Sequence, residues 1–214
     1  VKSQIQMNPD DYGVEWQAPP ELTRVVGQLL HPSGLKGVNE FKAPEGLLAE
    51  LRPYQQRGVQ WISTLANIGL NGILADDMGL GKTLQTLTLL LQEKQKGRLE
   101  HPALVVMPTS VLGTWESELN RFAPALRVLR HHGSQRTRDP KDLRAYDVIL
   151  TTYTLFRQDV LLHRQHTYSW LILDEAQSIK NPRSRTALAA CAQPATHRLC
   201  LSGTPLENNL ENLW

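Results

Sequence analysis

The sequence predicts an α/β domain built on a mostly parallel, doubly wound sheet that is flanked by helices. From residue 51 onward, apolar runs of strand length alternate with segments of helical periodicity. Runs such as Ala103–Met107 and Trp170–Leu173 are apolar almost throughout, which is typical of strands covered on both faces. A glycine-containing turn that ends in Gly-Lys-Thr separates the first strand from the next helix. Because alternating strands and helices require crossover connections, the strands are expected to run parallel.

Local patterns place each element along the chain. The first helix is expected to begin at Leu51-Arg52-Pro53, because proline is favourable in a first helical turn, and to end near Gly69. Short apolar runs predict strands at 72–75, 103–107, 126–130, 147–151, 170–174 and 197–201. Helical spacing of apolar residues predicts helices at 83–95, 109–122, 140–145, 153–162 and 183–192.

Composition and punctuation divide the chain of 214 residues into two parts. Residues 1–46 are interrupted by five prolines and predict an irregular or helical N-terminal extension or linker, whereas residues 47–214 form the α/β domain. The formal net charge of +2 neither demands nor excludes a nucleic acid partner. The apolar runs are far shorter than a membrane span, and no secretory signal pattern opens the chain. Because the chain starts at Val1 and stops within a helix-like pattern at Trp214, we expect it to be a piece of a longer protein.

The turn between residues 72 and 83 has the pattern of a phosphate-binding loop. Gly79 and Gly81 allow main-chain N–H groups to close around an anion at the N-terminus of the next helix. Lys82 would then reach the β and γ phosphates, and the Thr83 hydroxyl would hold Mg²⁺. The strict pattern has glycine where Asp76 stands. The alternative is a helix that merely begins with a polar turn.

Two further polar segments follow buried strands. Asp174 and Glu175 come directly after the run Trp170–Leu173, so Asp174 is expected to hold the metal and Glu175 to orient and deprotonate the attacking water. Ser202 and Thr204 follow another apolar run, and their hydroxyls could bond the turn from Asp174 to Gln177. The alternatives are an acidic strand-to-turn junction and an ordinary Ser-Gly-Thr-Pro turn.

Set in order, these segments resemble one family. Its motifs are matched by Leu-Arg-Pro-Tyr-Gln, Asp-Asp-Met-Gly-Leu-Gly-Lys-Thr, Val-Val-Met-Pro-Thr-Ser-Val-Leu-Gly-Thr-Trp, Leu-Thr-Thr-Tyr, Asp-Glu-Ala-Gln-Ser-Ile-Lys-Asn-Pro and Leu-Ser-Gly-Thr-Pro-Leu-Glu-Asn-Asn. The series is similar to that of the Swi/Snf ATPases, DNA translocases of helicase superfamily two, and more to their bacterial branch. The resemblance covers about residues 47–214 and implies the first of two RecA-like lobes.

The resemblance also implies roles for individual residues. Gln55 would hydrogen-bond the adenine, with support from Arg52, and the nucleotide would be held by Asp77, Met78, Gly79, Leu80, Gly81, Lys82, Thr83 and Leu84. Asp77 stands where the family usually has glutamate. The DNA backbone would be touched by Pro108, Thr109, Ser110, Thr151 and Thr152, although these residues could also simply cap helices. Nucleotide state would be coupled to the second lobe through Gln177, Ser202, Gly203 and Thr204, and the catalytic set would be Lys82, Asp174, Glu175 and Gln177.

The implied function is that of a DNA-stimulated ATPase that uses ATP and Mg²⁺ to move along double-stranded DNA and remodel a DNA-bound protein. In such an enzyme the second lobe supplies the arginine of the transition state, so this chain alone is expected to hydrolyse ATP scarcely at all. The expected location is the bacterial cytoplasm or nucleoid. Two alternatives stay open: a strand-separating helicase of the same superfamily, and a nucleotide- and DNA-binding module without turnover. A nucleoside kinase or GTPase is disfavoured.

Other conspicuous residues are assigned to packing or solvation. Trp61, Trp115 and Trp170 lie on apolar faces and are expected in the core. The pairs His131-His132 and His163 with His166 lack the spacing of a zinc site.

Overall fold

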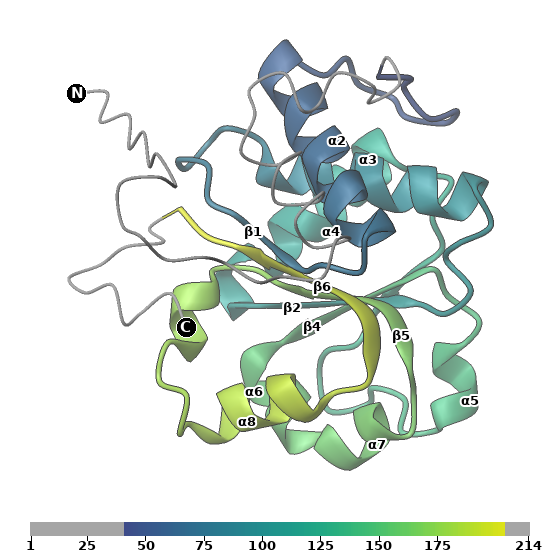
Figure 1. Cartoon of the computed structure of the whole chain (residues 1–214). Coiled ribbons are helices and arrows are strands. Elements are labelled where there is room, and N and C mark those ends of the chain that lie inside the picture. The colour runs from purple at the N-terminus through teal and green to yellow at the C-terminus, as the bar shows by residue number, and fades with distance from the viewer. Residues whose placement is uncertain (1–40, 204–214) are drawn as a thin grey trace, which may run out of the picture. The chain divides into compact units, whose positions relative to one another are not determined.

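The computed structural model describes residues 41–203, and these form one α/β layer structure (Figure 1). Its sheet has six strands in the order β1-β6-β5-β2-β4-β3, and every neighbouring pair is parallel. The strands are β1 (Gly72–Leu74), β2 (Ala103–Met107), β3 (Val128–Arg130), β4 (Val148–Thr152), β5 (Tyr168–Leu173) and β6 (Ala195–Leu201). The predicted α/β class with a parallel sheet is therefore confirmed.

Helices cover both faces of the sheet, as a doubly wound fold requires (Figure 1). One face carries α2 (Pro53–Asn67), α3 (Lys82–Gln95) and α4 (Leu112–Phe122). The other carries α5 (Pro140–Leu143), α6 (Tyr153–Gln158), α7 (Val160–Arg164) and α8 (Arg185–Ala192). Two short 3₁₀ helices, η2 (Thr109–Val111) and η3 (Ala176–Ile179), follow β2 and β5.

The position of β2 between two layers of helices explains why polar and apolar residues do not alternate in its sequence. Ala103, Val105 and Met107 join the core under α2, α3 and α4, whereas Leu104 and Val106 join the core on the opposite face. Because successive side chains of a strand point to opposite faces, a strand between two helical layers must be apolar at every position.

The expected elements agree with the structure to within two residues at most ends, with four differences. The predicted helix 109–122 begins as η2 before α4, and the predicted helix 153–162 is divided at Asp159 into α6 and α7. The strand predicted at 147–151 is β4, which ends one residue later, at Thr152. The 3₁₀ helix η3 was not predicted.

Part of the predicted N-terminal extension packs on the α/β domain. The side chains of Gln92 and Gln95 on α3 donate hydrogen bonds to the carbonyl oxygens of Lys42 (3.1 Å) and Glu45 (2.6 Å). Phe41 packs against the core. Residues 1–40, which make up the rest of that extension, lie outside the described residues. Among the helices of residues 41–203, none is long and apolar enough to cross a bilayer.

The topology brings the predicted site residues to one edge of the sheet. All six strands are parallel, so their carboxyl ends lie together. Ligands of open α/β sheets bind at this edge, near the point where the strand order reverses.

Candidate functional site

The turn between β1 and α3 has the geometry of a phosphate-binding loop. Gly79 and Gly81 have φ angles of 81° and 77°, a left-handed conformation that glycine adopts without steric cost. The Lys82 ammonium donates hydrogen bonds to the carbonyl oxygens of Asp76 (2.7 Å) and Asp77 (3.1 Å). The lysine side chain therefore folds back over the loop at the N-terminus of α3, where an anion is favoured.

The aspartate that replaces the first glycine of the strict pattern is accommodated by helix α3. Gln85 Nε2 donates a hydrogen bond to Asp76 Oδ2 (2.9 Å). This bond ties the Asp76 carboxylate to the helix that follows the loop. The substitution therefore has a partner of its own, and Asp76 still offers its carbonyl oxygen to Lys82.

Helix α2 contacts the phosphate-binding loop through Gln55. Gln55 is only 7% exposed; its Nε2 donates to the Leu80 carbonyl oxygen (3.1 Å), and its Oε1 accepts the Arg52 main-chain N–H (2.9 Å). A side chain at position 81 would collide with Gln55, because a Cβ there would lie 2.5 Å from its Nε2. One amide hydrogen and one Oε1 lone pair of Gln55 remain for a further partner. Its predicted bond to adenine, like the support from Arg52, stays a prediction.

Asp174 follows β5 directly, and both of its carboxylate oxygens and its carbonyl oxygen accept hydrogen bonds. Its Oδ2 accepts from Trp115 Nε1 (2.7 Å), its Oδ1 accepts from the Glu175 N–H (2.9 Å), and its carbonyl oxygen accepts from the Tyr153 hydroxyl (2.7 Å). Burial raises the pKa of Asp174, and the bonds from Trp115 and Glu175 and the charge of Lys82 offset only part of this. Within residues 41–203, Asp174 makes no ion pair.

Glu118 on α4 interacts with both expected metal ligands, Thr83 and Asp174. Burial raises the pKa of the Glu118 carboxyl, and the Asp174 carboxylate raises it further. A hydrogen bond with the Thr83 side chain lowers the same pKa. The start of α3 and the end of β5 thus face one glutamate from two sides.

Glu175, Gln177 and Ser202 form a chain of hydrogen bonds beside the loop. Gln177 Nε2 donates to Glu175 Oε2 (2.6 Å), and the Ser202 hydroxyl donates to Gln177 Oε1 (3.0 Å). The expectation that Ser202 bonds the turn after Asp174 is confirmed, whereas Thr204 lies outside the described residues. Glu175 has a φ angle of 50°, and it is the one non-glycine residue with a positive φ among residues 41–203. This conformation costs about 1–3 kcal/mol of backbone strain, and such strain is concentrated at functional sites.

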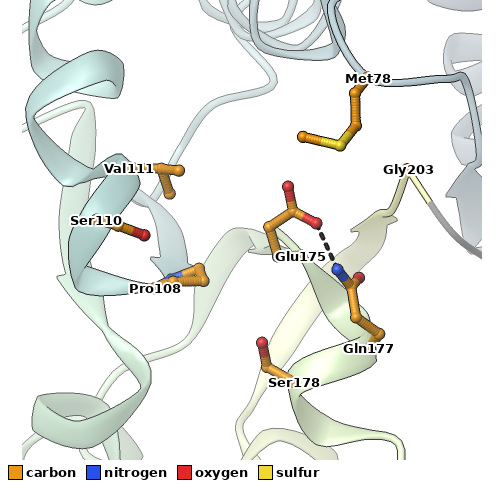
Figure 2. Close-up of a pocket in the computed structure, with 8 residues that line it drawn as sticks. All are labelled: Met78, Pro108, Ser110, Val111, Glu175, Gln177, Ser178 and Gly203. Carbon is orange, nitrogen blue, oxygen red and sulfur yellow. Dashed lines mark hydrogen bonds between the residues drawn. The ribbon is translucent and has the colours of Figure 1, made fainter.

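Glu175 and Gln177 line a pocket of about 390 Å³ at the carboxyl edge of the sheet (Figure 2). One Glu175 carboxylate oxygen is bonded to Gln177, and the other points into the pocket (Figure 2). Gly203 lies close to the phosphate loop, since a Cβ there would meet Met78 Cγ at 2.8 Å. The lining residues are Met78, Pro108, Ser110, Val111, Glu175, Gln177, Ser178 and Gly203.

The segments expected to touch DNA differ from one another. Thr109 and Ser110 are exposed, and Ser110 lines the pocket. Thr151 and Thr152 are only 0% and 2% exposed, and the Thr152 hydroxyl accepts the Leu155 N–H (3.4 Å) at the start of α6. Burial withdraws these two hydroxyls from a ligand on the surface, and the capping role is the one seen for Thr152. A DNA contact of Pro108, Thr109 and Ser110 stays a prediction.

Sequence reasoning missed three residues of the site. Trp115 was assigned to the core, and it is 1% exposed, but its indole N–H also bonds Asp174. Tyr153 was seen only as part of a motif, and Glu118 was not singled out. Their partners lie far away along the chain, so the local sequence carries no signal of these contacts.

The histidines of the described residues are not grouped as ligands of a metal ion. Among residues 41–203, no group of three or more histidine, cysteine or acidic side chains is arranged to hold a metal ion. His163 is buried, and burial lowers its pKa to about 3, so it stays neutral while its Nδ1 shares a hydrogen bond with the Tyr168 hydroxyl (2.8 Å).

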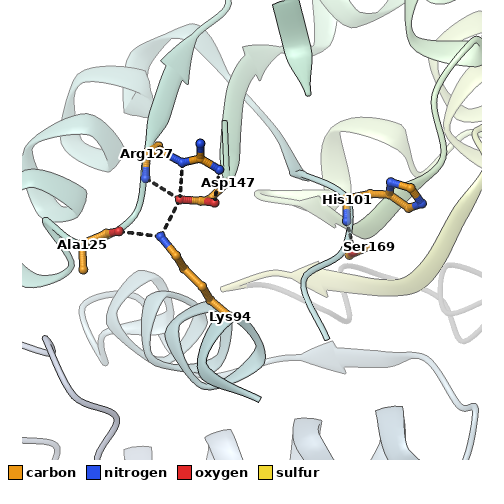
Figure 3. A network of polar contacts seen from close by, with 6 residues as sticks. All are labelled: Lys94, His101, Ala125, Arg127, Asp147 and Ser169. Atoms are coloured by element: carbon orange, nitrogen blue, oxygen red, sulfur yellow. Dashed lines mark hydrogen bonds and ion pairs between the residues drawn. The ribbon is translucent and has the colours of Figure 1, made fainter. Parts of the chain in front are cut away.

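A second buried aspartate lies at the opposite edge of the sheet, before β4 (Figure 3). Asp147 accepts hydrogen bonds from Lys94 Nζ (2.7 Å) and from Arg127 Nη2 (3.0 Å). Lys94 also donates to the Ala125 carbonyl oxygen (2.7 Å). Burial raises the pKa of Asp147, but the bonds from Arg127 and Lys94 outweigh it and lower the pKa to about 2.

The donor set at the carboxyl edge fits a magnesium nucleotide. Two left-handed glycines, a lysine and a helix N-terminus suit phosphate, and the Thr83 hydroxyl and the Asp174 carboxylate are oxygen ligands of the kind Mg²⁺ prefers. The buried Asp174 has uncharged hydrogen-bond partners, so a cation would complete its surroundings.

Comparison with known proteins identifies the family and the fold of the chain. The SNF2-related domain matches residues 54–214. YwqA of Bacillus subtilis, named as a candidate ATP-dependent helicase/translocase, is 38% identical over 94% of this chain and 22% of its own length. The helicase SWR1 of Candida albicans is 38% identical over the whole chain and 14% of its own length. The chain thus spans less than a quarter of the length of these relatives.

Solved structures agree with this similarity. The SWI2/SNF2 ATPase core of Sulfolobus solfataricus in complex with double-stranded DNA superposes with a TM-score of 0.74 at 39% identity. The match covers 82% of this chain and 36% of that one. A second structure, of the Sulfolobus solfataricus SWI2/SNF2 ATPase core domain, gives a TM-score of 0.70 at 40% identity over 82% of this chain and 35% of that one. The described sheet therefore has the RecA-like fold of that core.

Proposed function

Because this chain belongs to the SNF2-related family, we propose that it is the first ATPase lobe of a DNA-stimulated translocase that binds MgATP and the backbone of duplex DNA. One observation carries the proposal. The phosphate loop, the Thr83 hydroxyl and the carboxyl group of Asp174 converge at one edge of the sheet, next to a glutamate that faces an open pocket.

The residues of the chain divide the work of hydrolysis. Lys82 binds the γ-phosphate with an ammonium that already donates to two carbonyl groups of its own loop. Thr83 and Asp174 hold Mg²⁺, which when bound neutralises charge that develops on the β and γ phosphates. Glu175 presents its pocket-facing oxygen to water, accepts the water proton as the water oxygen bonds to the γ phosphorus, and ADP leaves.

Gln177 and Ser202 keep Glu175 in place and link the site to the end of β6. The Gln177 amide occupies one Glu175 oxygen, which leaves the other for water. Ser202 holds the Gln177 amide through its carbonyl end. A movement of the segment after β6 is therefore passed to the residue that positions water. Gly203 and Thr204 are the continuation of this link toward the second lobe.

DNA contact is proposed at the exposed segment after β2. Pro108, Thr109 and Ser110 lie at the start of η2, beside the pocket, and their main chain and hydroxyls suit phosphate oxygens rather than base edges. Binding of this kind is independent of sequence and weakens as the salt concentration rises. The solved relative in complex with double-stranded DNA supports this choice of partner.

The second lobe of the same polypeptide completes the site. We propose that it contributes an arginine, a contribution that reaches ~10³–10⁵ in rate in other phosphoryl-transfer enzymes. The chain alone would therefore bind nucleotide weakly and turn it over scarcely at all. The target moved along DNA would be a DNA-bound protein, and the expected location is the bacterial cytoplasm or nucleoid.

The test is ATP hydrolysis by the full-length protein, with and without duplex DNA, beside the 214-residue chain and the variant Lys82→Ala. We expect duplex DNA to accelerate the full-length protein, the isolated chain to be nearly inactive, and Lys82→Ala to abolish turnover. Full activity without DNA would contradict the translocase, and strong activity of a monomeric chain would contradict the need for a second lobe. Separation of a labelled duplex during turnover would favour the helicase instead.

A further inference from the structure

Besides the bond that its carboxylate accepts from the Glu175 N–H, Asp174 makes three hydrogen bonds with two neighbouring strands or with the segments that follow them. The Asp174 N–H donates to the Val106 carbonyl oxygen (2.9 Å) on β2. Its carboxylate accepts from Trp115 on α4, and its carbonyl oxygen accepts from Tyr153 at the start of α6 (2.7 Å each). The carboxylate oxygen that accepts from Trp115 is therefore not free to rotate without losing a buried hydrogen bond.

The two aromatic donors belong to the segments that the sequence associates with DNA. Trp115 lies on α4, which continues without a break from η2 and its exposed Thr109 and Ser110. Tyr153 directly follows Thr152, and Thr152 pairs with Met107, so both segments leave the sheet side by side. β5, which Asp174 directly follows, is the neighbour of β2 on its other side.

The bonds are of a kind that can set the geometry of a carboxylate. An indole N–H donates and cannot accept, and Trp115 is 1% exposed, so the Trp115 side chain has no other described polar partner to turn to. A donor behind a metal-holding carboxylate fixes its direction and tunes its strength as a ligand. A shift of η2 moves the ring of Trp115 because the two share one continuous helical segment.

We propose that Trp115 and Tyr153 are positioning residues which transmit the placement of η2 and of the segment that follows β4 to the metal-holding residue Asp174. The inference rests on the proposed function, because it assumes Mg²⁺ at Asp174 and DNA at η2. DNA bound at η2 would fix the indole and thereby the carboxylate, so duplex would strengthen metal binding. By linkage, bound metal nucleotide would strengthen duplex binding by the same factor.

The test measures Mn²⁺ binding to the full-length protein with ADP by electron paramagnetic resonance, with and without duplex DNA. The variants are Tyr153→Phe, which keeps the ring and removes the donor, and Trp115→Phe, which replaces the indole by a smaller aromatic ring and removes the donor. The matched controls are Trp170→Phe and Tyr168→Phe. Trp170 is also 1% exposed, and its Nε1 has no partner among the described residues. Tyr168 is buried and bonds His163 at the far end of β5.

We expect duplex DNA to tighten Mn²⁺ binding in the natural protein and in both controls. Trp115→Phe should weaken Mn²⁺ binding about tenfold, in the range known for residues behind a metal ligand, and should remove most of the effect of DNA. Tyr153→Phe should act in the same direction and less, because it bonds the main chain of Asp174.

Two results would overturn the inference, and they differ in what they leave standing. If Trp115→Phe and Tyr153→Phe behave as their controls while Lys82→Ala abolishes DNA-stimulated hydrolysis, the positioning role is wrong and the proposed function stands. If the natural protein binds no Mn²⁺ with ADP and shows no DNA-stimulated hydrolysis, both are wrong.

Discussion

The two edges of the sheet, at the amino and carboxyl ends of the strands, each hold a buried aspartate. The two aspartates differ in their charged partners and in the direction of their pKa shifts. Asp147 and Asp174 are both 8% exposed. Asp147 forms ion pairs with Lys94 and Arg127, and its pKa falls to about 2 (Figure 3). Asp174 accepts only from uncharged donors among the described residues, and burial raises its pKa. We therefore interpret the ion-paired Asp147 as structural, and we propose that Asp174, a buried carboxylate without a cationic partner, serves a ligand.

The largest expected effect is a difference in the rate of ATP hydrolysis between variants of the two aspartates. Asp174→Asn removes a charge that would bind Mg²⁺, so we expect DNA-stimulated ATP hydrolysis by the full-length protein to fall on the order of 10²–10³-fold. Asp147→Asn should leave the rate within about twofold at 25 °C, because Asp147 lies at the far edge of the sheet. Equal losses in steady-state hydrolysis by the two variants would contradict the distinction.

Stability should separate them in the reverse order. Asp147→Asn leaves Lys94 and Arg127 without their anion, but both cations are partly exposed and can be hydrated. We therefore expect a loss of about 2–3 kcal/mol in the free energy of unfolding, near the lower end for a broken buried pair. Asp174→Asn should cost less, about 0–1 kcal/mol, because the removal of an unpaired buried charge offsets the loss of one of the two hydrogen bonds that its carboxylate oxygens accept. Urea unfolding of the 214-residue chain measures both variants.

The pH dependence of stability sharpens the contrast. The pKa of Asp147 is about 2 in the folded protein against an ordinary 3.8, so its ion pairs stabilise the fold above about pH 4. This stability is lost as the pH falls from about 4 to about 2, and the shift corresponds to about 2 kcal/mol. Asp159, whose pKa is also lowered, adds to the same acid sensitivity despite the opposing effect of its own burial. In Asp147→Asn the loss between pH 4 and 2 should be smaller by about 2 kcal/mol; an unchanged profile would assign the acid sensitivity to other carboxylates.

The smallest expected effect compares two lysines of one helix. Lys82 and Lys94 both lie on α3, and each ammonium bonds a main-chain carbonyl group. Lys94→Ala should lower the free energy of unfolding by about 1 kcal/mol, because Asp147 keeps Arg127, and should leave hydrolysis unchanged. Lys82→Ala should leave unfolding nearly unchanged and abolish hydrolysis. Thermal unfolding of the chain and hydrolysis by the full-length protein check the two halves.

The sequence predicted what is encoded locally. The parallel sheet was predicted from apolar runs. Lys82 was predicted from the turn that ends in Gly-Lys-Thr before a helix, and Asp174 and Glu175 from their position directly after a strand. Bonds between distant segments could not be predicted in this way. Trp115 and Asp174 are 59 positions apart, and a tryptophan on an apolar face is equally typical of a core residue.

A shift of one residue decided the outcome at the end of β4. The strand was expected to end at residue 151, which would have left Thr152 in the following loop. It extends to Thr152, so this threonine lies within the buried strand together with Thr151, which the prediction already placed there. Apolar periodicity locates a strand well but does not fix its last residue, because capping threonines suit both the strand and the next helix.

The difference between the two aspartates is tested most directly by Mn²⁺ binding to the full-length protein with ADP. The natural protein and Asp147→Asn should give the same bound Mn²⁺ signal and affinity, whereas Asp174→Asn should lose the site. Retention of tight Mn²⁺ binding in a folded Asp174→Asn variant would contradict the assignment of Asp174 as the metal-holding residue.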